Sequence, residues 1–454
     1  MASNRTKDMT VGDPKKIILS FGVPLLIGML FQQCYNMADT IIVGRCLGVE
    51  KLAAVGSTGA INFMVLGFCM GICNGFTIPI AQCFGAKDYK NLRKYIANCV
   101  WTASAFLLVI TVAVCFFCRD ILELMQTPAN IIDAAYDYIF VVFLGIPVTF
   151  LYNILSGIIR AMGDSKSPLY FLAIAAGLNI VLDFVTILVF GMDVNGPAWA
   201  TVVSQAVSAI LCFIYMVKKF DILKIQKDEW EFNPRYVWTL CRMGVPMGLQ
   251  YSITAIGSVV IQSAVNSLGS SAVASVTAAN KVGMFVCCPF DAMGSTMATY
   301  AGQNMGAGKP DRVTKGMLSC SAMGLVYSLA ACVVMVFFGE HLASIFIDGK
   351  TNADILHNAW LMNVWSSSFY FPLALVNIIR FTIQGLGYSE LAILAGVCEM
   401  IARALVGFGF VPKFGFVAVC TASPLAWIFA DIFLIIAYIY VIKRVKKRLS
   451  FASA

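Results

Sequence analysis

Five acidic residues fall inside long apolar stretches of this 454-residue chain, where a charge is costly. They are Asp39, Asp183, Asp291, Glu399 and Asp431. An ionised carboxylate at the centre of a bilayer costs at least about 3 kcal/mol, so such residues usually bind a ligand, pair with another charge or carry protons. Each of the five is therefore a candidate functional residue.

The two carboxylates of the first half come with neutral oxygen atoms nearby. Asn179 precedes Asp183 by four residues, so the amide and the carboxylate share one helix face. Asp39 lies toward the same outer side, and Asn153 and Thr201 lie in neighbouring apolar stretches. Such a set suits a small hard cation, and two adjacent carboxylates also suit proton exchange. The pattern leaves Na+ and H+ open, and also the alternative of two unrelated hydrogen bonds between helices.

The second half carries a different set of charges. Glu399 and Arg403 stand four residues apart and could neutralise each other. Otherwise, we expect Glu399 and Asp291 to face a cavity that attracts a cationic substrate, and Asp431 to be a packing or network residue. Apolar Met and Phe side chains beside a carboxylate suit flat lipophilic cations. The predicted cavity-lining residues are Phe63, Met64, Phe68, Met70, Met284 and Phe285.

Membrane helices must position these residues. The chain is 59% hydrophobic and 12% charged, whereas about 25% of a soluble domain is charged. Apolar stretches long enough for a hydrocarbon core of about 30 Å recur along the chain. They predict an all-α membrane protein with twelve transmembrane spans, at about 17–43, 52–80, 95–117, 131–157, 168–190, 197–217, 237–265, 272–301, 316–338, 355–382, 390–411 and 415–442.

The basic residues set the orientation. With the N-terminus inside, most of the 32 Lys and Arg residues fall in cytoplasmic segments, and Arg380 is assigned to them. Lys281 and Arg403 lie within spans. This asymmetry fits the positive-inside rule and predicts that both termini are cytoplasmic. The net charge of +8 is then a topology signal and does not indicate nucleic-acid binding. The outer loops hold only Arg45, Lys51, Arg119, Lys350 and Lys413.

Short motifs recur along the chain at a nearly constant offset. The sequence QCFGA at Gln82–Ala86 recurs as QNMGA at Gln303–Ala307, and GVP at Gly22–Pro24 recurs at Gly244–Pro246. A constant offset over half the chain marks a duplicated unit.

The duplication predicts two parallel six-helix repeat lobes, because six spans return the chain to the side on which it entered. Many secondary transporters have this architecture, with the substrate path between the repeats. We predict an N-lobe of residues 1–217, a cytoplasmic linker of residues 218–236 and a C-lobe of residues 237–454. Pro24 and Pro246 occupy the same place in the repeat and are predicted hinges, although inherited helix shape would also explain them.

Enzyme chemistry has little support in the sequence. Most of the 16 cysteines sit inside spans, as small apolar packing residues do. His341 and His357, the only histidines, give no metal-ligand or triad spacing, and no activated nucleophile is apparent. We therefore expect no enzyme activity, no cofactor and no metal other than Na+.

These features together resemble the multidrug and toxic compound extrusion (MATE) family over essentially the whole chain. The resemblance rests on the two six-span lobes and on Gln-x-x-Gly-Ala after spans 2 and 8. It rests also on QQCYNMADT at Gln32–Thr40, and on RAMGD at Arg160–Asp164 followed by Lys166 and Pro168. It implies the architecture of that family's superfamily and a cation-coupled exporter in the bacterial inner membrane.

Within the family, the chain is most similar to the prokaryotic branch of DNA-damage-inducible and staphylococcal-type exporters. That branch uses a span-1 Asp and a span-5 Asn…Asp pair, which match Asp39, Asn179 and Asp183 here. Asn153 and Thr201 fall where the branch has polar neighbours. The other main bacterial branch has acids in spans 7 and 10, and those spans contain none here beyond the terminal Asp354.

The resemblance implies an antiporter that exports lipophilic, mostly cationic drugs and toxic compounds by alternating access. The coupling ion would be H+ or Na+, and the partners would be lipophilic cationic small molecules and the lipid bilayer. We expect a monomer, because both lobes lie in one chain. The alternatives are export of an endogenous metabolite and flipping of a lipid-linked precursor. The flippase needs a cationic cavity, and Lys281 and Arg403 are the only bases that we expect within the spans.

Overall fold

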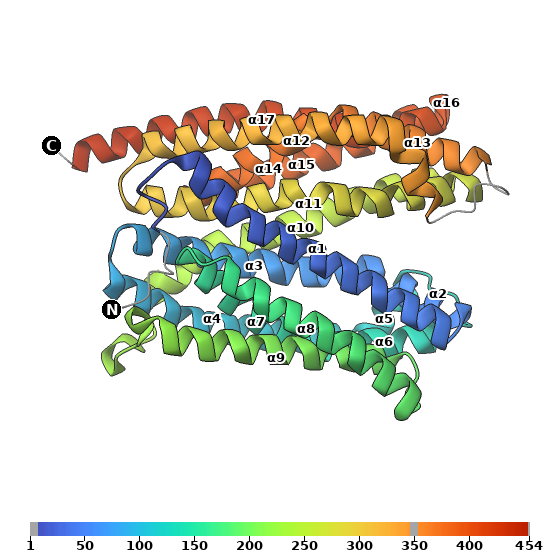
Figure 1. Cartoon of the computed structure of the whole chain (residues 1–454), viewed down its shortest axis with the longest axis horizontal. Helices are drawn as coiled ribbons and strands as arrows, with labels where there is room; N and C mark the ends of the chain where they lie inside the picture. Colours follow the sequence, from blue (N-terminus) through green and yellow to red (C-terminus); the bar gives the residue numbers. More distant parts are fainter. Residues whose placement is uncertain (1–7, 346–352, 453–454) are drawn as a thin grey trace. The chain divides into compact units, whose positions relative to one another are not determined.

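The computed structural model describes residues 8–345 and 353–452, and over these residues it contains helices and no strands (Figure 1). The predicted outer-loop residue Lys350 lies outside the described residues. The all-α membrane fold predicted from the apolar stretches is confirmed.

Within the described residues, ten segments are long and apolar enough to cross a membrane as single helices. In the first half they are α1 (Pro14–Cys46), α2 with α3 (Val49–Ser57 and Gly59–Gly85), α4 (Tyr89–Phe116), α8 with the π-helical turn that continues it (Lys166–Phe184 and Val185–Val189), and α9 (Asn195–Lys219). In the second half they are α10 (Pro234–Asn266), α11 (Ser270–Gly306), α12 (Pro310–Ser344), α15 with its continuation (Ser389–Leu405, Val406–Phe410 and α16, Val411–Phe414), and α17 (Phe416–Ala452).

Two of the twelve predicted spans are broken helices. The span predicted at 131–157 is α6 (Ile132–Leu144) followed by α7 (Ile146–Ala161), with a bend of 43° between them. The span predicted at 355–382 corresponds to α13 (Ala353–Ser368) followed by α14 (Tyr370–Gly385), which are not among the segments long and apolar enough to cross a membrane. Each half is too short to cross a bilayer alone, since a span needs about 20 residues. Within the described residues the structure therefore supports ten of the twelve predicted spans, or eleven with the bent pair. The short helix α5 (Cys118–Leu124) and the single turns Asp221–Leu223 and Lys227–Glu229 lie between the spans.

The duplication is visible in the backbone as well as in the motifs. Gly48 and Gly269 have φ angles of 91° and 96°, and each precedes the helix that follows the first span of its repeat. Their offset, 269 − 48 = 221, is also that of the π-helical turns that begin at Val185 and Val406, 406 − 185 = 221. Glycine adopts such φ angles without the steric cost of a Cβ atom.

Contacts group the chain into two compact units. Among the described residues, unit 1 contains Asp8 and Ile27–Gly248, and unit 2 contains Met9–Leu26 and residues 249–345 and 353–452. These units depart from the predicted lobes at two helices, because the start of α1 belongs to unit 2 and the first half of α10 belongs to unit 1. The predicted boundaries followed the repeat along the sequence, which carries no sign of this exchange.

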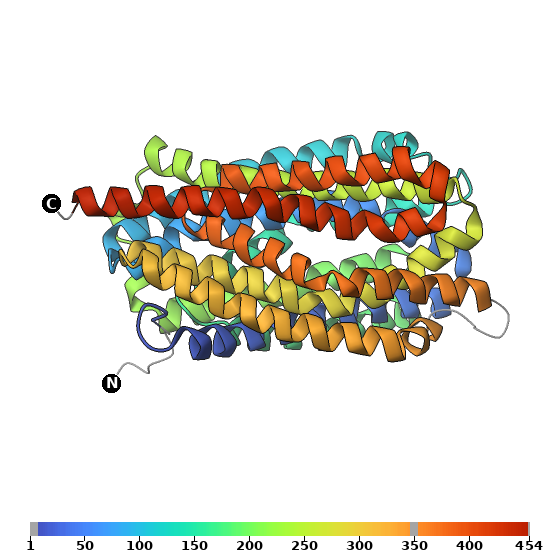
Figure 2. The ribbon, with the colours of Figure 1, turned by 90° about the horizontal axis from the view of Figure 1, so that it is seen from above.

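Each unit packs around its own broken helix. In unit 1, α7 lies against α3 and α9, and α8 lies against α9. Gly75 on α3 approaches α10 so closely that a Cβ atom would overlap the backbone of Gly244, which is how small residues bring membrane helices together. In unit 2, α14 lies against α11, α12 and α17, and α15 runs beside α17 (Figure 2).

Candidate functional site

The centre of the site in unit 1 is a pair of carboxyl groups. Asp39 on α1 and Asp183 at the end of α8 lie close enough for their carboxyl groups to interact, and the hydroxyl of Thr201 on α9 lies beside Asp39. Asp183 is fully buried. Within the described part of the chain, neither Asp183 oxygen nor Oδ1 of Asp39 has a hydrogen-bond partner. Two facing carboxylates repel unless a proton or a cation lies between them, so the arrangement is chemically able to accept one or the other.

Neutral oxygen atoms complete the group. The amide of Asn179 donates from Nδ2 to Oγ1 of Thr201 over 3.4 Å, which leaves its buried Oδ1 without a partner among the described residues. Thr201 in turn donates to the carbonyl of Pro197 over 3.0 Å. Asn153 on α7 donates instead to Thr149 of its own helix, over 2.8 Å. The structure therefore brings four of the five predicted coupling residues together and gives Asn153 a local partner.

Several neighbours were not predicted from the sequence. Tyr35 lies one helical turn before Asp39, and its hydroxyl accepts a hydrogen bond from Nε2 of Gln205 over 3.5 Å. Tyr35, Gln205 and Ser204 join Asn179 and Thr201 around a cavity with room for about one water molecule. Tyr138 on α6 also lies near both carboxylates. Only the Tyr35–Asp39 spacing could have indicated any of these, because tyrosine and glutamine are common on membrane helices.

The side chains around the carboxyl pair suit a proton or a small hard cation. Over residues 8–345 and 353–452, no three side chains among His, Cys, Asp and Glu gather as metal ligands. Carboxylate, amide and hydroxyl oxygens are the donors that hard cations prefer. The site can therefore hold a proton on one carboxyl group, hydrogen-bonded to the other, or a small cation between the two.

The buried charges of unit 2 form a different arrangement. Glu399 on α15 lies between two guanidinium groups: that of Arg380 on α14, with which it forms an ion pair, and that of Arg403, whose Nη2 lies 3.6 Å from Oε2. The side chains of Arg380, Glu399 and Arg403 are only 6%, 5% and 11% exposed. Asp431 on α17 is buried near Arg380 and Glu399, with Oδ1 unpartnered in the described structure.

Two predictions change as a result. Arg380 was assigned to the cytoplasmic segments as a loop base, but on α14 it is 5% exposed and forms an ion pair with Glu399 on the adjacent α15. Glu399 was predicted to face the substrate cavity, but two guanidinium groups already neutralise its carboxylate. The predicted network role of Asp431 fits its position beside this cluster.

The remaining predicted cavity residues lie on α3 and α11. Phe63 and Met64 on α3 are exposed, as are Met284 and Asp291 on α11. Phe68 packs instead against the core of unit 1 and against Gly248. Met70 and Phe285 are half-buried.

The predicted hinge prolines mark where two helices pass from one unit to the other. Unit 2 ends at Leu26 within α1, two residues after Pro24, and unit 1 ends at Gly248 within α10, two residues after Pro246. Proline removes a helix hydrogen bond and permits a bend, so both helices can change shape where their contacts change unit.

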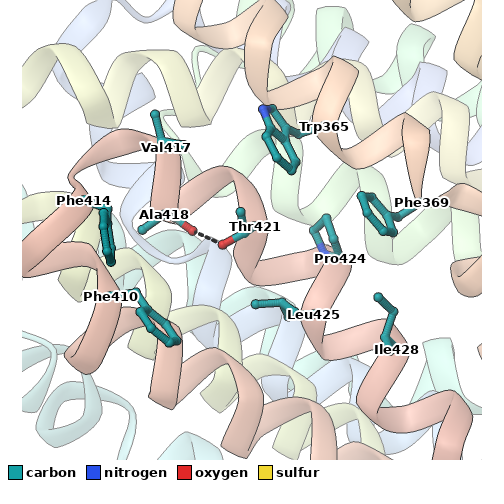
Figure 3. Close-up of a pocket in the computed structure, with 10 residues that line it drawn as sticks. All are labelled: Trp365, Phe369, Phe410, Phe414, Val417, Ala418, Thr421, Pro424, Leu425 and Ile428. Atoms are coloured by element: carbon teal, nitrogen blue, oxygen red, sulfur yellow. Dashed lines mark hydrogen bonds between the residues drawn. The ribbon is translucent and has the colours of Figure 1, made fainter.

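Unit 2 also has an apolar groove that was not predicted (Figure 3). Its volume is about 570 Å³, and its one hydroxyl, that of Thr421, donates to the carbonyl of Ala418 over 2.8 Å. The lining residues are Trp365, Phe369, Phe410, Phe414, Val417, Ala418, Thr421, Pro424, Leu425 and Ile428. The groove suits an apolar molecule and carries no charge to bind an ion.

Comparison with known proteins gives a consistent assignment. The MatE family model matches residues 24–185 and 246–408, one match in each repeat. The chain is 29% identical to the probable multidrug resistance protein YpnP of Bacillus subtilis, covering 82% of each chain. It is 22% identical to an FAD transporter of Shewanella oneidensis, covering 86% of each. A solved outward-facing multidrug resistance MATE transporter of the MOP superfamily superposes with a TM-score of 0.90, at 23% identity and with 98% and 100% of the two chains covered.

The family match spans most of the chain, and the solved transporter has the same fold. The expectation of a transporter and not an enzyme is confirmed. This chain belongs to the MatE family, the multidrug and toxic compound extrusion transporters, which are multi-pass membrane proteins.

Proposed function

We propose that this protein is a cation-coupled antiporter that exports lipophilic, mostly cationic compounds by alternating access. The observation that carries the proposal is the pair of facing carboxyl groups of Asp39 and Asp183, with buried oxygen atoms that lack hydrogen-bond partners among residues 8–345 and 353–452. A proton or Na+ satisfies those atoms, and its arrival and departure change the charge of the site by one unit. No organic cofactor is part of the proposal.

The coupling ion acts through the shape of α1. Asp39 lies on α1 beyond Pro24, so an ion shared with Asp183 on α8 draws this part of α1 toward α8. Neutralised carboxylates then favour a bent α1 and release of substrate to the outside. Ion-bound and ion-free states differ in their affinity for the substrate, which is the condition for exchange.

Each unit offers exposed side chains that suit such a substrate. Phe63 and Met64 on α3 of unit 1, and separately Met284 on α11 of unit 2, offer polarisable surface to a flat ring system. Asp291 supplies the negative charge that attracts a cation, because the carboxylate of Glu399 is already paired. We propose that the protein works as a monomer in a bacterial inner membrane, with both termini in the cytoplasm.

The test is efflux of a fluorescent lipophilic cation from vesicles that contain the purified protein. Efflux is measured under an imposed proton gradient and then under a sodium gradient, for the wild type and for Asp39→Asn. We expect one gradient to drive efflux in the wild type and the variant to lose it. Gradient-driven efflux that persists in Asp39→Asn would show that this carboxylate does not couple transport.

A second candidate is export of an anionic metabolite or flipping of a lipid-linked anionic precursor. The observation in its favour is Arg380, which adds a third base to the two expected within the spans. A relative named FAD transporter points in the same direction, because FAD is an anion. Gene loss separates the two: lipid-precursor accumulation indicates a flippase, and increased drug susceptibility indicates an exporter.

A further inference from the structure

The five residues before α1 form a leader segment, Met9–Asp13, whose first two residues are held by side chains of unit 2. The amide of Met9 donates to Oε1 of Gln303 over 3.0 Å. The carbonyl of Met9 accepts from Nδ2 of Asn304 over 3.3 Å and from Nη2 of Arg312 over 3.3 Å. Nζ of Lys309 donates to the carbonyl of Thr10 over 3.0 Å.

The four side chains that hold this leader come from the second copy of the repeated motif and the residues just after it. Gln303 and Asn304 begin QNMGA at the end of α11, Lys309 immediately precedes α12, and Arg312 lies in the first turn of α12. Gln303, Asn304 and Met9 are all fully buried. Two of the donors are charged, and charged hydrogen bonds are about twice as strong as neutral ones. Met9 and Thr10 are buried and have several partners, so this is a specific contact, whereas residues 11–13 are exposed.

The other repeat shows the same arrangement with different side chains. The linker before α10 is held by α4 of unit 1: Arg93 binds the buried carboxylate of Glu229 through two hydrogen bonds of 2.7 and 2.8 Å. Asn98 donates to the carbonyl of Glu231 and accepts from the amide of Asn233. The segment before α1 is therefore held in unit 2 although α1 ends in unit 1, and the linker before α10 is held in unit 1 although α10 ends in unit 2.

Helix α1 connects the held leader to the coupling site. Ile17, Ile18 and Phe21 are buried at 5%, 3% and 1% exposure in the part of α1 that belongs to unit 2. After Pro24 the helix passes into unit 1 and reaches Asp39. A bend in α1 between Pro24 and Asp39 can be used for a conformational change only if the start of the helix stays fixed.

We propose that Gln303, Asn304, Lys309 and Arg312 form a clamp on Met9–Thr10, a positioning site that fixes the start of α1 during transport. Because the clamp fixes the start of α1, ion binding at Asp39 bends the helix and does not simply displace Met9–Asp13. This inference rests on the proposed coupling function of Asp39.

The experiment compares Arg312→Ala and Asn304→Ala with the wild type in reconstituted full-length protein. Arg448→Ala, at an exposed arginine of α17, is the matched control. Hydrogen–deuterium exchange of the Met9–Asp13 peptide reports the clamp, and substrate efflux gives Vmax and KM. We expect exchange to rise and Vmax to fall, each about tenfold in Arg312→Ala, which loses a charged hydrogen bond, and about fivefold in Asn304→Ala, which loses a neutral one. KM should stay within about twofold, because conformational steps set turnover. Arg312→Lys, which keeps a charged donor, should restore most of the Vmax.

Ion binding is read separately, as the ion-induced change in tryptophan fluorescence. It should be unchanged in the clamp variants and lost in Asp39→Asn, which separates failure of the clamp from failure of the coupling site. Faster exchange with an unchanged Vmax would overturn the proposal, since the leader would then be anchored without effect on transport. Unchanged exchange in both alanine variants would also overturn it. Should Arg312→Ala not fold, Lys309→Ala at the rim of the clamp carries the same test.

Discussion

Replacing Glu399 by glutamine should destabilise unit 2 strongly, because two buried guanidinium groups would lose their shared counter-charge. In the wild type, Arg380 and Arg403 both form ion pairs with this carboxylate. Two of their nitrogen atoms, Nε of Arg380 and Nη1 of Arg403, already lack hydrogen-bond partners in the described structure. Removal of one partner from a buried ion pair costs about 3–5 kcal/mol. With a melting shift of roughly 2–4 °C per kcal/mol for domains of this size, we expect a fall of about 10 °C.

The assay is thermal unfolding of purified protein in detergent, followed by intrinsic fluorescence. Glu123→Gln is the matched control, because Glu123 pairs with Arg119 over 3.5 Å while both side chains are more than half exposed, at 59% and 55%. Exposed pairs contribute at most about 1 kcal/mol. If Glu399→Gln shifted melting no more than this control does, Glu399 would not be paired in the folded protein, and its predicted place in the substrate cavity would regain support.

The sequence was sufficient for the fold because membrane helices are specified by length and apolar composition. The repeat predicted that the second half of the chain has the same order of helices as the first. The helices and the repeated backbone features of the structure show both properties. The broken spans were harder to anticipate. At the break before Ile146, Gly145 lies so close to Val202 that a Cβ atom would overlap the valine side chain, and hydropathy does not encode such a tertiary contact.

The proposed coupling site was predictable for a different reason. Asn179 and Asp183 share a helix face through their spacing alone, whereas Asp39 was grouped with them only because it lies toward the same outer side and because it matches the family's span-1 Asp. Arg380 was missed because it lies five residues before the end of α14, a position typical of an interfacial base, and its partner Glu399 lies on another helix. The leader contact between Met9 and Gln303 joins residues 294 positions apart, so no local pattern could have indicated it.

Two further predictions concern the packing and the linker of unit 1. Gly75→Leu should prevent α3 from packing against α10, because even a Cβ atom would overlap the backbone of Gly244; loss of folded protein in size-exclusion chromatography measures this, and a monodisperse variant would contradict it. The linker should detach in acid. The hydrogen bonds from Arg93 hold the pKa of Glu229 below its ordinary value. This stabilisation is therefore fully present above the unfolded pKa of about 4.3 and is lost as the pH falls through the lower folded pKa. Hydrogen exchange of residues 226–233, corrected for intrinsic rates, should stay constant from about pH 7 to about pH 5 and accelerate only in stronger acid. In Glu229→Gln, exchange should already be fast at neutral pH, since the charged hydrogen bonds are absent, and equal protection of the variant and the wild type at neutral pH would refute the role of this ion pair.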